Sequence, residues 1–432
     1  MALINSTIIL ADDLTGANDT ALQYFKNNLR SRIVIDCSKD FTDADDVDVW
    51  AISTESRNIP KEESVDRIVW VVNRAKEHIG VDNYYKKIDS TLRGNVGVEV
   101  VTLMEMLSFD AVVIAPAYIE ENRTTIGSYQ LLNGIPIERT QCALDPKAPI
   151  YESYIPDIIA KDLNEKYVEL IDKIDFKTVT KGAGPVMAKL NELIQKGKKI
   201  IIIDAISNTD LEQIALAINK SNYNILPVGS AGLANAFNKE HNIEEREKEF
   251  TVAKLPRLIV SGSATKMSET QVQKLREERK NTFFVDLKAK NIFEEIDENM
   301  VNSIVQNLNS NVDVVVHCFE IKKDDEETDN LLIDAGIAKQ DFASKITDFL
   351  GNLVGEINSK SDFILILLGG ETSYKCLDKI NSTYLEIMDA IMPSIPLCKD
   401  KNNKIIVTKS GNFGTTNTLV EILNYFDKAK NV

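Results

Sequence analysis

Residues 7–25 read TIILADDLTGANDTALQYF, and this stretch decides the fold class. The apolar run at residues 7–11 has the length of a buried strand, and residues 14–25 have the apolar spacing of a helix. Asp12 and Asp13 stand at the junction between the two. The stretch therefore predicts a strand, an acidic turn and a helix, which together begin an α/β domain with a largely parallel sheet.

The same alternation of strand-length runs and helical segments continues through the first half and restarts near residue 255. A chain of 432 residues also exceeds what one hydrophobic core usually fills. We therefore expect two α/β domains with Rossmann-like layers. A charge-dense segment marks the boundary between them. The expected division is 1–238 for the first domain, 239–254 for a connection and 255–432 for the second domain.

Two segments depart from the alternation. Residues 124–140, TTIGSYQLLNGIPIERT, place Asn133 and Gly134 between two β-prone runs, which predicts a β-hairpin arm with a type I′ turn in the first domain. The acidic run KKDDEETD at residues 322–329 is expected to form a solvated loop.

Composition excludes several classes of partner. Lys and Arg number 50 against 66 for Asp and Glu, so the formal net charge is −16 and repels nucleic acid and anionic membranes. The first residues, MALINSTII, lack the basic and apolar regions typical of a signal peptide, and the sequence has no run of about 18 apolar residues, so we expect a cytoplasmic protein. Five scattered cysteines and three separate histidines indicate reduced thiols and no zinc site. The sequence leaves open whether the chain forms a homo-oligomer.

Three turns of small residues in the second half could hold phosphate. Each follows an expected strand and precedes an expected helix, where backbone N–H groups are unpaired and glycine lets a phosphate approach closely. Any one of them alone is more simply a loop or a helix cap. They match neither a Walker A loop nor a dinucleotide fingerprint. The turns are centred on Ser261–Gly262–Ser263, on Gly369–Gly370–Glu371–Thr372 and on Ser410–Gly411.

Three charged stretches in the first half follow expected strands: ADDLTGAND, STESRNIP and YYKKIDSTLRGN. Arg57 or Lys87 could bind an anionic substrate, while Asp12 and Asp89 could accept hydrogen bonds from its hydroxyl groups. Structural alternatives exist for some of these residues. Asp13 or Thr15 could cap the helix, Asp19 could complement its dipole, and Asp89 could pair with Arg93.

Taken in order, ADDLTGAND, TESR, KIDSTLRGN, APAY with NRTT, VGSAGLA, SGSAT, GGETS and TKSGNFG resemble the four-carbon acid sugar kinase family over nearly the full length. The resemblance implies ATP-dependent phosphorylation of threonate, erythronate or a 3-oxo-tetronate, with an acid-binding N-terminal domain and a nucleotide-binding C-terminal domain. By similarity, Asp12, Arg57, Lys87, Ile88 and Asp89 would bind the sugar acid, and Ser261, Gly369, Gly370, Glu371, Thr372 and Gly411 would bind ATP.

Some positions depart from the family pattern. Asn122 and Ser394 stand where the family usually has glycine, Ile119 stands where it has proline, and Thr415 and Thr416 stand where an acid is common. These differences bear on the particular substrate and on the arm.

The mechanism expected from these residues is phosphoryl transfer, which depends on positioning and on neutralising charge. Arg57 and Lys87 would fix the acid, the C-terminal turns would hold ATP with Mg²⁺, and Asp89 or Asp12 would take the hydroxyl proton. Two alternative functions would use part of the same pattern. An aspartyl-phosphate phosphatase would require a D-x-D-x-T motif, and Ala11 occupies its nucleophile position. A non-catalytic sugar-acid-binding protein would not need three phosphate-type turns.

Overall fold

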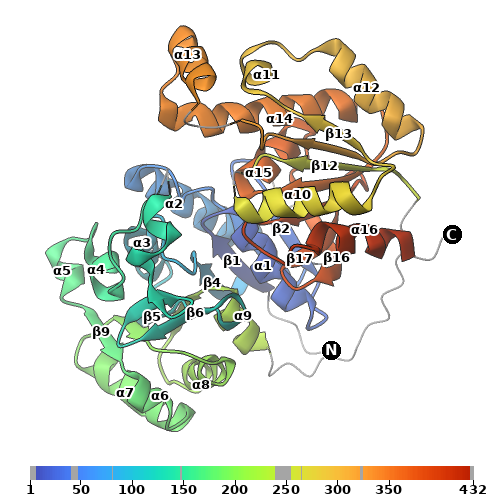
Figure 1. Cartoon of the computed structure of the whole chain (residues 1–432). Helices are drawn as coiled ribbons and strands as arrows, with labels where there is room; N and C mark the ends of the chain where they lie inside the picture. The colour runs from blue at the N-terminus through green and yellow to red at the C-terminus, as the bar shows by residue number, and fades with distance from the viewer. Residues whose placement is uncertain are drawn as a thin grey trace. The chain divides into compact units, whose positions relative to one another are not determined.

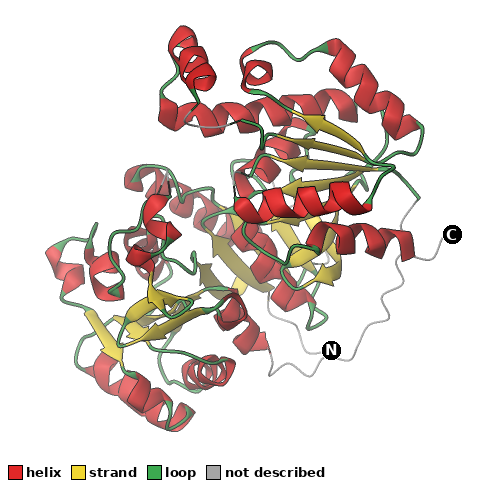
Figure 2. Cartoon of the chain, in the orientation of Figure 1, coloured by secondary structure: helices red, strands yellow, loops and turns green. Residues whose placement is uncertain are grey.

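The computed structural model describes residues 6–39, 47–79, 81–145, 148–238, 254–263, 265–321 and 325–428. The chain divides into two compact units, Met1–Glu245 and Arg246–Val432. Both are α/β, as the sequence predicts (Figure 2). Of the expected connection at 239–254, only Lys254 lies within the described residues, so its structure stays a prediction.

The first unit contains a parallel sheet with the strand order β2-β3-β1-β4-β11-β5-β10-β9. β1 lies between β3 and β4, so the residues that follow these three strands meet at one edge of the sheet. The strands are β1 (Ser6–Ala11), β2 (Ser31–Val34), β3 (Val49–Ser53), β4 (Val81–Lys87), β5 (Ala111–Ala115), β9 (Ile171–Ile174), β10 (Ile200–Ile203) and β11 (Ile225–Gly229).

Helices of the first unit cover this sheet (Figure 1). Their apolar sides pack with the β-branched residues of the strands; Ile8, Ile52 and Val100 are fully buried in one core. The helices are α1 (Leu14–Phe25), α2 (Lys61–His78), α3 (Val96–Met106), α4 (Ile155–Ala160), α5 (Glu165–Val168), α6 (Phe176–Val179), α7 (Ala183–Gln195), α8 (Asn208–Asn219) and α9 (Ala231–Asn238), with 3₁₀ turns η1 (Ile119–Glu121), η2 (Ile137–Arg139) and η3 (Gln141–Leu144).

The predicted β-hairpin arm is confirmed. It is a separate antiparallel sheet of β6 (Arg123–Ile126), β7 (Tyr129–Leu132) and β8 (Ile135–Pro136). Asn133 and Gly134 connect β7 to β8 with φ of 53° and 76°, and two positive φ angles are the mark of a type I′ turn.

The second unit has the strand order β13-β14-β12-β15-β18-β17-β16. The first five strands run parallel, and β17 is antiparallel to both of its neighbours, β18 and β16. The switch point of this sheet lies between β12 and β15, where ligands bind in doubly wound folds. The strands are β12 (Arg257–Ser261), β13 (Phe283–Asp286), β14 (Val314–His317), β15 (Ile364–Leu368), β16 (Tyr384–Met392), β17 (Ile395–Asp400) and β18 (Ile405–Lys409).

Helices also cover this second sheet, and Figure 1 shows β12 and β13 between α10 and α14. α13 begins inside the acidic run at 322–329, so the predicted loop is wrong for Glu326–Asp329, while residues 322–324 lie outside the described residues. Acidic side chains in a first turn stabilise a helix because they lie at the positive end of its dipole. None of the described helices is long and apolar enough to cross a membrane. The helices are α10 (Lys266–Glu278), α11 (Ala289–Phe293), α12 (Glu298–Asn309), α13 (Glu326–Ala335), α14 (Phe342–Asn358), α15 (Gly370–Lys379) and α16 (Thr418–Lys428), with η4 (Lys339–Asp341).

Candidate active site

Asp12 and Asp13 follow β1 directly but have different surroundings. Asp12 is buried, with 3% of its surface exposed. Asp13 is the N-cap of α1: its Oδ1 accepts the N–H of Gly16 at 2.8 Å, and its Oδ2 accepts the hydroxyl of Thr15 at 2.6 Å. The predicted cap at Asp13 is therefore confirmed.

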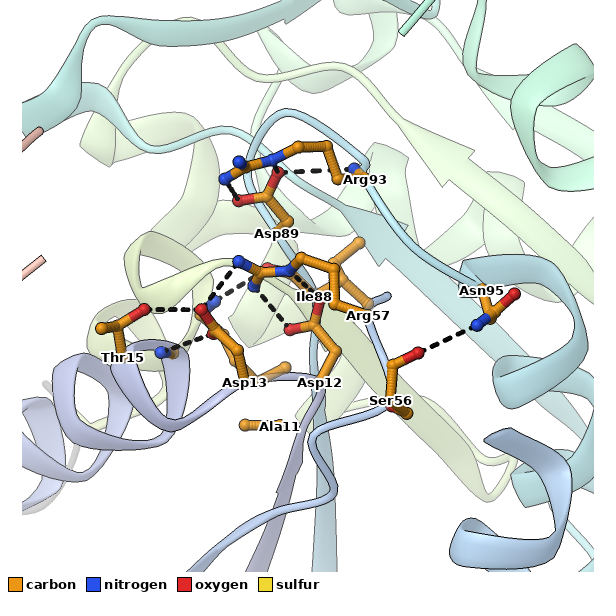
Figure 3. Close-up of polar contacts among 12 residues, drawn as sticks. Ala11, Asp12, Asp13, Thr15, Ser56, Arg57, Ile88, Asp89, Arg93 and Asn95 are labelled. Atoms are coloured by element: carbon orange, nitrogen blue, oxygen red, sulfur yellow. Dashed lines mark hydrogen bonds and ion pairs between the residues drawn. The ribbon is translucent and has the colours of Figure 1, made fainter. Parts of the chain in front are cut away.

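Arg57 joins both carboxylates. Its Nε and Nη2 donate to Asp12 Oδ2 at 2.7 Å and Oδ1 at 3.0 Å, and its Nη1 donates to Asp13 Oδ2 at 2.7 Å (Figure 3). Burial alone would raise the pKa of Asp13, but the charges of Arg57 and Lys87, together with the hydrogen bonds from Thr15 and Gly16, hold it below its usual value. A guanidinium has five N–H donors, so Arg57 keeps two for a ligand.

The backbone around Arg57 is also fixed. The N–H groups of Ser56 and Arg57 donate to the carbonyl oxygen of Asp12 at 3.0 and 3.2 Å. Gly94, with φ of 95°, lies so close that a Cβ there would be 3.3 Å from the Arg57 Cα. This packing joins the loop after β3 to the loop after β4.

Lys87 is the last residue of β4, and Ile88 follows it. Lys87 is only 5% exposed, and its ammonium donates to the carbonyl oxygen of Ile88 at 2.9 Å. A Cβ on Gly16 would lie 2.9 Å from Lys87 Nζ, so this charge lies against the start of α1. The Ile88 side chain belongs to the hydrophobic core, and the Ile88 backbone N–H donates to the carbonyl oxygen of Gly229. Ile88 can therefore contact a ligand only through its backbone.

Asp89 is paired with Arg93, as one of the two sequence interpretations has it. Arg93 Nε and Nη2 donate to Asp89 Oδ2 at 2.7 Å and Oδ1 at 3.1 Å, and Thr91 Oγ1 also donates to Asp89. Burial would raise the pKa of Asp89, but Arg93 and Arg57 reverse this and hold it well below its usual value. The Asp89 side chain is therefore a carboxylate at neutral pH.

Sequence reasoning missed Glu55, which lies beside this cluster. Its Oε1 accepts the N–H of Leu14 at 2.8 Å and the hydroxyl of Ser53 at 2.6 Å. Burial raises the pKa of Glu55 to about 7, and the Asp13 charge adds to the effect. The backbone φ of Glu55 is 47°, a left-handed conformation that few side chains adopt. Glu55 lies between Thr54 and Ser56, and no sequence pattern there indicates that it belongs to the site.

In the second unit, Ser261 ends β12 and is fully buried. Its hydroxyl oxygen has no hydrogen-bond partner among the residues that the structure describes. A buried polar atom without a partner is uncommon and calls for a ligand or a water molecule. Next to it, Gly262 packs so tightly that a Cβ there would lie 2.4 Å from Thr372 Oγ1.

The three turns of small residues, here called the glycine turns, come together at Ser263. A Cβ on Gly411 would lie 2.2 Å from Ser263 Oγ, and a Cβ on Gly369 would lie 3.5 Å from Ser263 Cβ. The hydroxyls of Thr265 and Ser268 donate to the Gly411 carbonyl oxygen at 2.8 and 2.9 Å. The structure therefore brings these three predicted turns together at the carboxyl ends of β12, β15 and β18.

Two helices begin at this point. α15 starts at Gly370 with Gly369 as its N-cap, so Gly370, Glu371 and Thr372 form its first turn. α10 starts at Lys266 with Thr265 as its N-cap. Unpaired N–H groups and the positive ends of two helix dipoles suit an anion, and a phosphate chain in particular.

Domain models identify the class of protein. Residues 7–237 match a sugar-binding N-terminal domain, and residues 258–419 match a nucleotide-binding C-terminal domain. The first match covers more than half of the chain. The protein therefore combines a sugar-binding domain with a nucleotide-binding domain.

Characterised relatives give the family. A D-threonate kinase of Salmonella typhimurium is 29% identical, with 98% of each chain covered. A D-erythronate kinase of Heliobacterium modesticaldum is 26% identical, covering 98% of this chain and 97% of the relative. A 3-oxo-tetronate kinase of Haemophilus influenzae is 25% identical over 94% and 96%. The chain belongs to the four-carbon acid sugar kinase family, as the resemblance predicts.

Solved structures show the same fold. A Salmonella typhimurium protein for which a tRNA synthase activity was suggested has a TM-score of 0.81 at 21% identity, over 96% of this chain and 98% of its own. A Haemophilus influenzae protein has a TM-score of 0.74 at 24% identity, over 97% and 100%. At these identities the likeness concerns the fold alone.

Proposed function

We propose that this protein phosphorylates a hydroxyl group of a four-carbon sugar acid with ATP. The first unit would bind the acid and the second unit the nucleotide. The observation that carries the proposal is the cluster of Arg57, Asp12, Asp13 and Lys87 at the carboxyl edge of the first sheet. Such a cluster offers cations for a carboxylate and acceptors for hydroxyl groups.

The acid would be bound from two sides. The two remaining N–H donors of Arg57 and the ammonium of Lys87 would hold the substrate carboxylate, and the Ile88 backbone would line the site. Asp12 and Asp89 each have lone pairs beyond those that their arginines use, and these would accept hydrogen bonds from the hydroxyl groups of the sugar acid. A site built to hydrogen-bond hydroxyl groups rejects an acid that lacks them.

ATP would occupy the convergence of the glycine turns. The buried Ser261 hydroxyl would find its missing partner in the nucleotide, and the first turn of α15, Gly370 to Thr372, would bind phosphate through N–H groups. Gly369 and Gly411 would let these turns pack closely around the phosphates, because a Cβ at either position would lie within 3.5 Å of the Ser263 side chain.

Magnesium would be carried by the nucleotide. Within the described parts of the chain no three His, Cys, Asp or Glu side chains come together as a metal site. Mg²⁺ bound to phosphates needs only one or two protein carboxylates and keeps its waters, so the residues present are compatible with it. When bound, it would neutralise charge on the transferring phosphoryl group.

The role of the aspartates follows from their pairing. The low pKa of Asp89 makes it a weak base in the ground state. Phosphoryl transfer through a loose transition state needs little proton removal before the bond to phosphorus forms, so a charged carboxylate that orients the hydroxyl is sufficient. Asp89 or Asp12 would orient the attacking hydroxyl and take its proton late.

A coupled assay of ADP release tests the function. Purified full-length protein would be given ATP and Mg²⁺ together with D-threonate, D-erythronate or a 3-oxo-tetronate. Control reactions would omit the acid or the ATP. We expect ADP release that requires both ATP and one of the acids. Phosphate release from a phosphorylated acid without ATP would indicate the phosphatase alternative. Acid binding without turnover would indicate the binding-protein alternative.

A further inference from the structure

A buried ion pair lies next to the loop that carries Arg57. Glu99 of α3 is 1% exposed, and its Oε2 is 2.6 Å from the ammonium nitrogen of Lys86 on β4, which is fully buried. Taking two charges out of water costs free energy, and a well-packed apolar pair is often as stable. Stability alone therefore does not explain why a charged pair occupies this buried position.

The second carboxylate oxygen of Glu99 links this pair to the loop that carries Arg57. Glu99 Oε1 accepts the hydroxyls of Ser56 and Ser64, both at 2.5 Å, and both serines are fully buried. Ser64 is part of α2, whereas Ser56 immediately precedes Arg57. One carboxylate oxygen therefore joins a helix to the loop of the proposed acid site.

Every polar group of Ser56 is held. Its hydroxyl donates to Glu99 and also lies 2.7 Å from the Thr54 hydroxyl, and its N–H donates to the Asp12 carbonyl oxygen at 3.0 Å. Its carbonyl accepts from Asn95 Nδ2 at 2.9 Å (Figure 3). Hydrogen bonds to a charged acceptor are the stronger kind. The Glu99 bond is thus the strong restraint on the residue from which Arg57 begins.

We propose that Glu99, with its charge balanced by Lys86, is a positioning residue for the Arg57 guanidinium in binding the sugar acid. It acts through the Ser56 hydroxyl and does not touch the substrate. This inference rests on the proposed function, because it assigns Glu99 to the acid site of that same reaction.

The two serines supply a matched test. Ser56→Ala and Ser64→Ala each remove one buried hydroxyl from the same Glu99 oxygen, and only Ser56 leads to Arg57. In the full-length protein we expect Ser56→Ala to raise KM for the acid about tenfold, the loss of one charge-assisted hydrogen bond, with KM for ATP unchanged. Ser64→Ala should leave both KM values unchanged while lowering Tm to a similar extent.

A double-mutant cycle with Arg57→Lys completes the test, because a residue that acts through Arg57 loses its effect when Arg57 is replaced. Ser56→Ala should then add no further increase in KM for the acid. Equal KM changes in both serine variants, or a lower Tm with unchanged KM in Ser56→Ala, would overturn the inference alone. A wild-type protein that phosphorylates none of the acids would overturn the proposed function and this inference together.

Discussion

Arg57 and Asp12 form a two-bond ion pair that joins the loops after β3 and β1, with distances of 2.7 and 3.0 Å. The pair is almost fully buried, with side chains 11% and 4% exposed. Asp12, Asp13 and Asp89 together raise the pKa of Arg57 above its usual value despite the burial. A permanently charged, rigidly held guanidinium is thus presented at the carboxyl edge of the sheet.

Arg57→Lys should weaken acid binding. A lysine keeps the charge but cannot reproduce the planar fork that contacts both aspartates. Losing one to two charge-assisted hydrogen bonds predicts a rise in KM for the acid of about 10- to 100-fold, with KM for ATP unchanged, in steady-state ADP release. Arg139→Lys is the control, because that side chain is 75% exposed. An unchanged KM for the acid in Arg57→Lys would contradict the role given to Arg57.

Asp89→Asn and Asp12→Asn should lower turnover. Each amide keeps the shape of the carboxylate but cannot take the hydroxyl proton, so we expect kcat to fall by about 100-fold or more in at least one variant, with ATP affinity preserved. The control is Asp145→Asn, which removes another carboxylate from Arg93 without touching Asp89. Full activity in both Asp89→Asn and Asp12→Asn would refute the assignment of the proton acceptor.

Gly411→Ala should disrupt nucleotide binding. The added methyl group would lie 2.2 Å from Ser263 Oγ and force the glycine turns apart. We expect KM for ATP to rise about tenfold or more while KM for the acid stays constant, since misplacing one turn removes at least one phosphate contact. Gly184→Ala is the matched control, because a Cβ there meets nothing within 4 Å. Equal KM values for ATP in both variants would argue against phosphate binding at this turn.

Local patterns in the sequence predicted local structure well. The cap at Asp13 and the turn at Asn133–Gly134 depend on residues close in the chain, and both are confirmed. The two departures from the family's glycines also have a local explanation. Asn122 and Ser394 have φ of 57° and 61°, in the left-handed region that favours glycine.

Contacts between distant residues could not be predicted in the same way. Arg57 was expected to bind substrate, but nothing in the chain indicates that it also bridges Asp12 and Asp13, which lie more than 40 residues away. Glu99 interrupts an otherwise apolar helix segment, VGVEVVTL, which could have marked it as a buried charge. Its partner Lys86 could not have been identified, because Lys87 beside it has the same charge and a different surrounding.

Glu55→Gln should change how stability depends on pH. Burial raises the pKa of Glu55 from 4.5 to about 7, so the folded protein binds this proton more tightly than the unfolded chain does. The stabilisation is complete below about pH 4.5 and is lost as the pH rises to about 7, by about 3 kcal/mol at most. Glutamine resembles the protonated acid at every pH. The Tm of Glu55→Gln relative to wild type should therefore increase between pH 5 and pH 8. Parallel curves of Tm against pH for wild type and Glu55→Gln would contradict the raised pKa. Glu277→Gln is the control for the loss of a surface charge, because Glu277 is exposed.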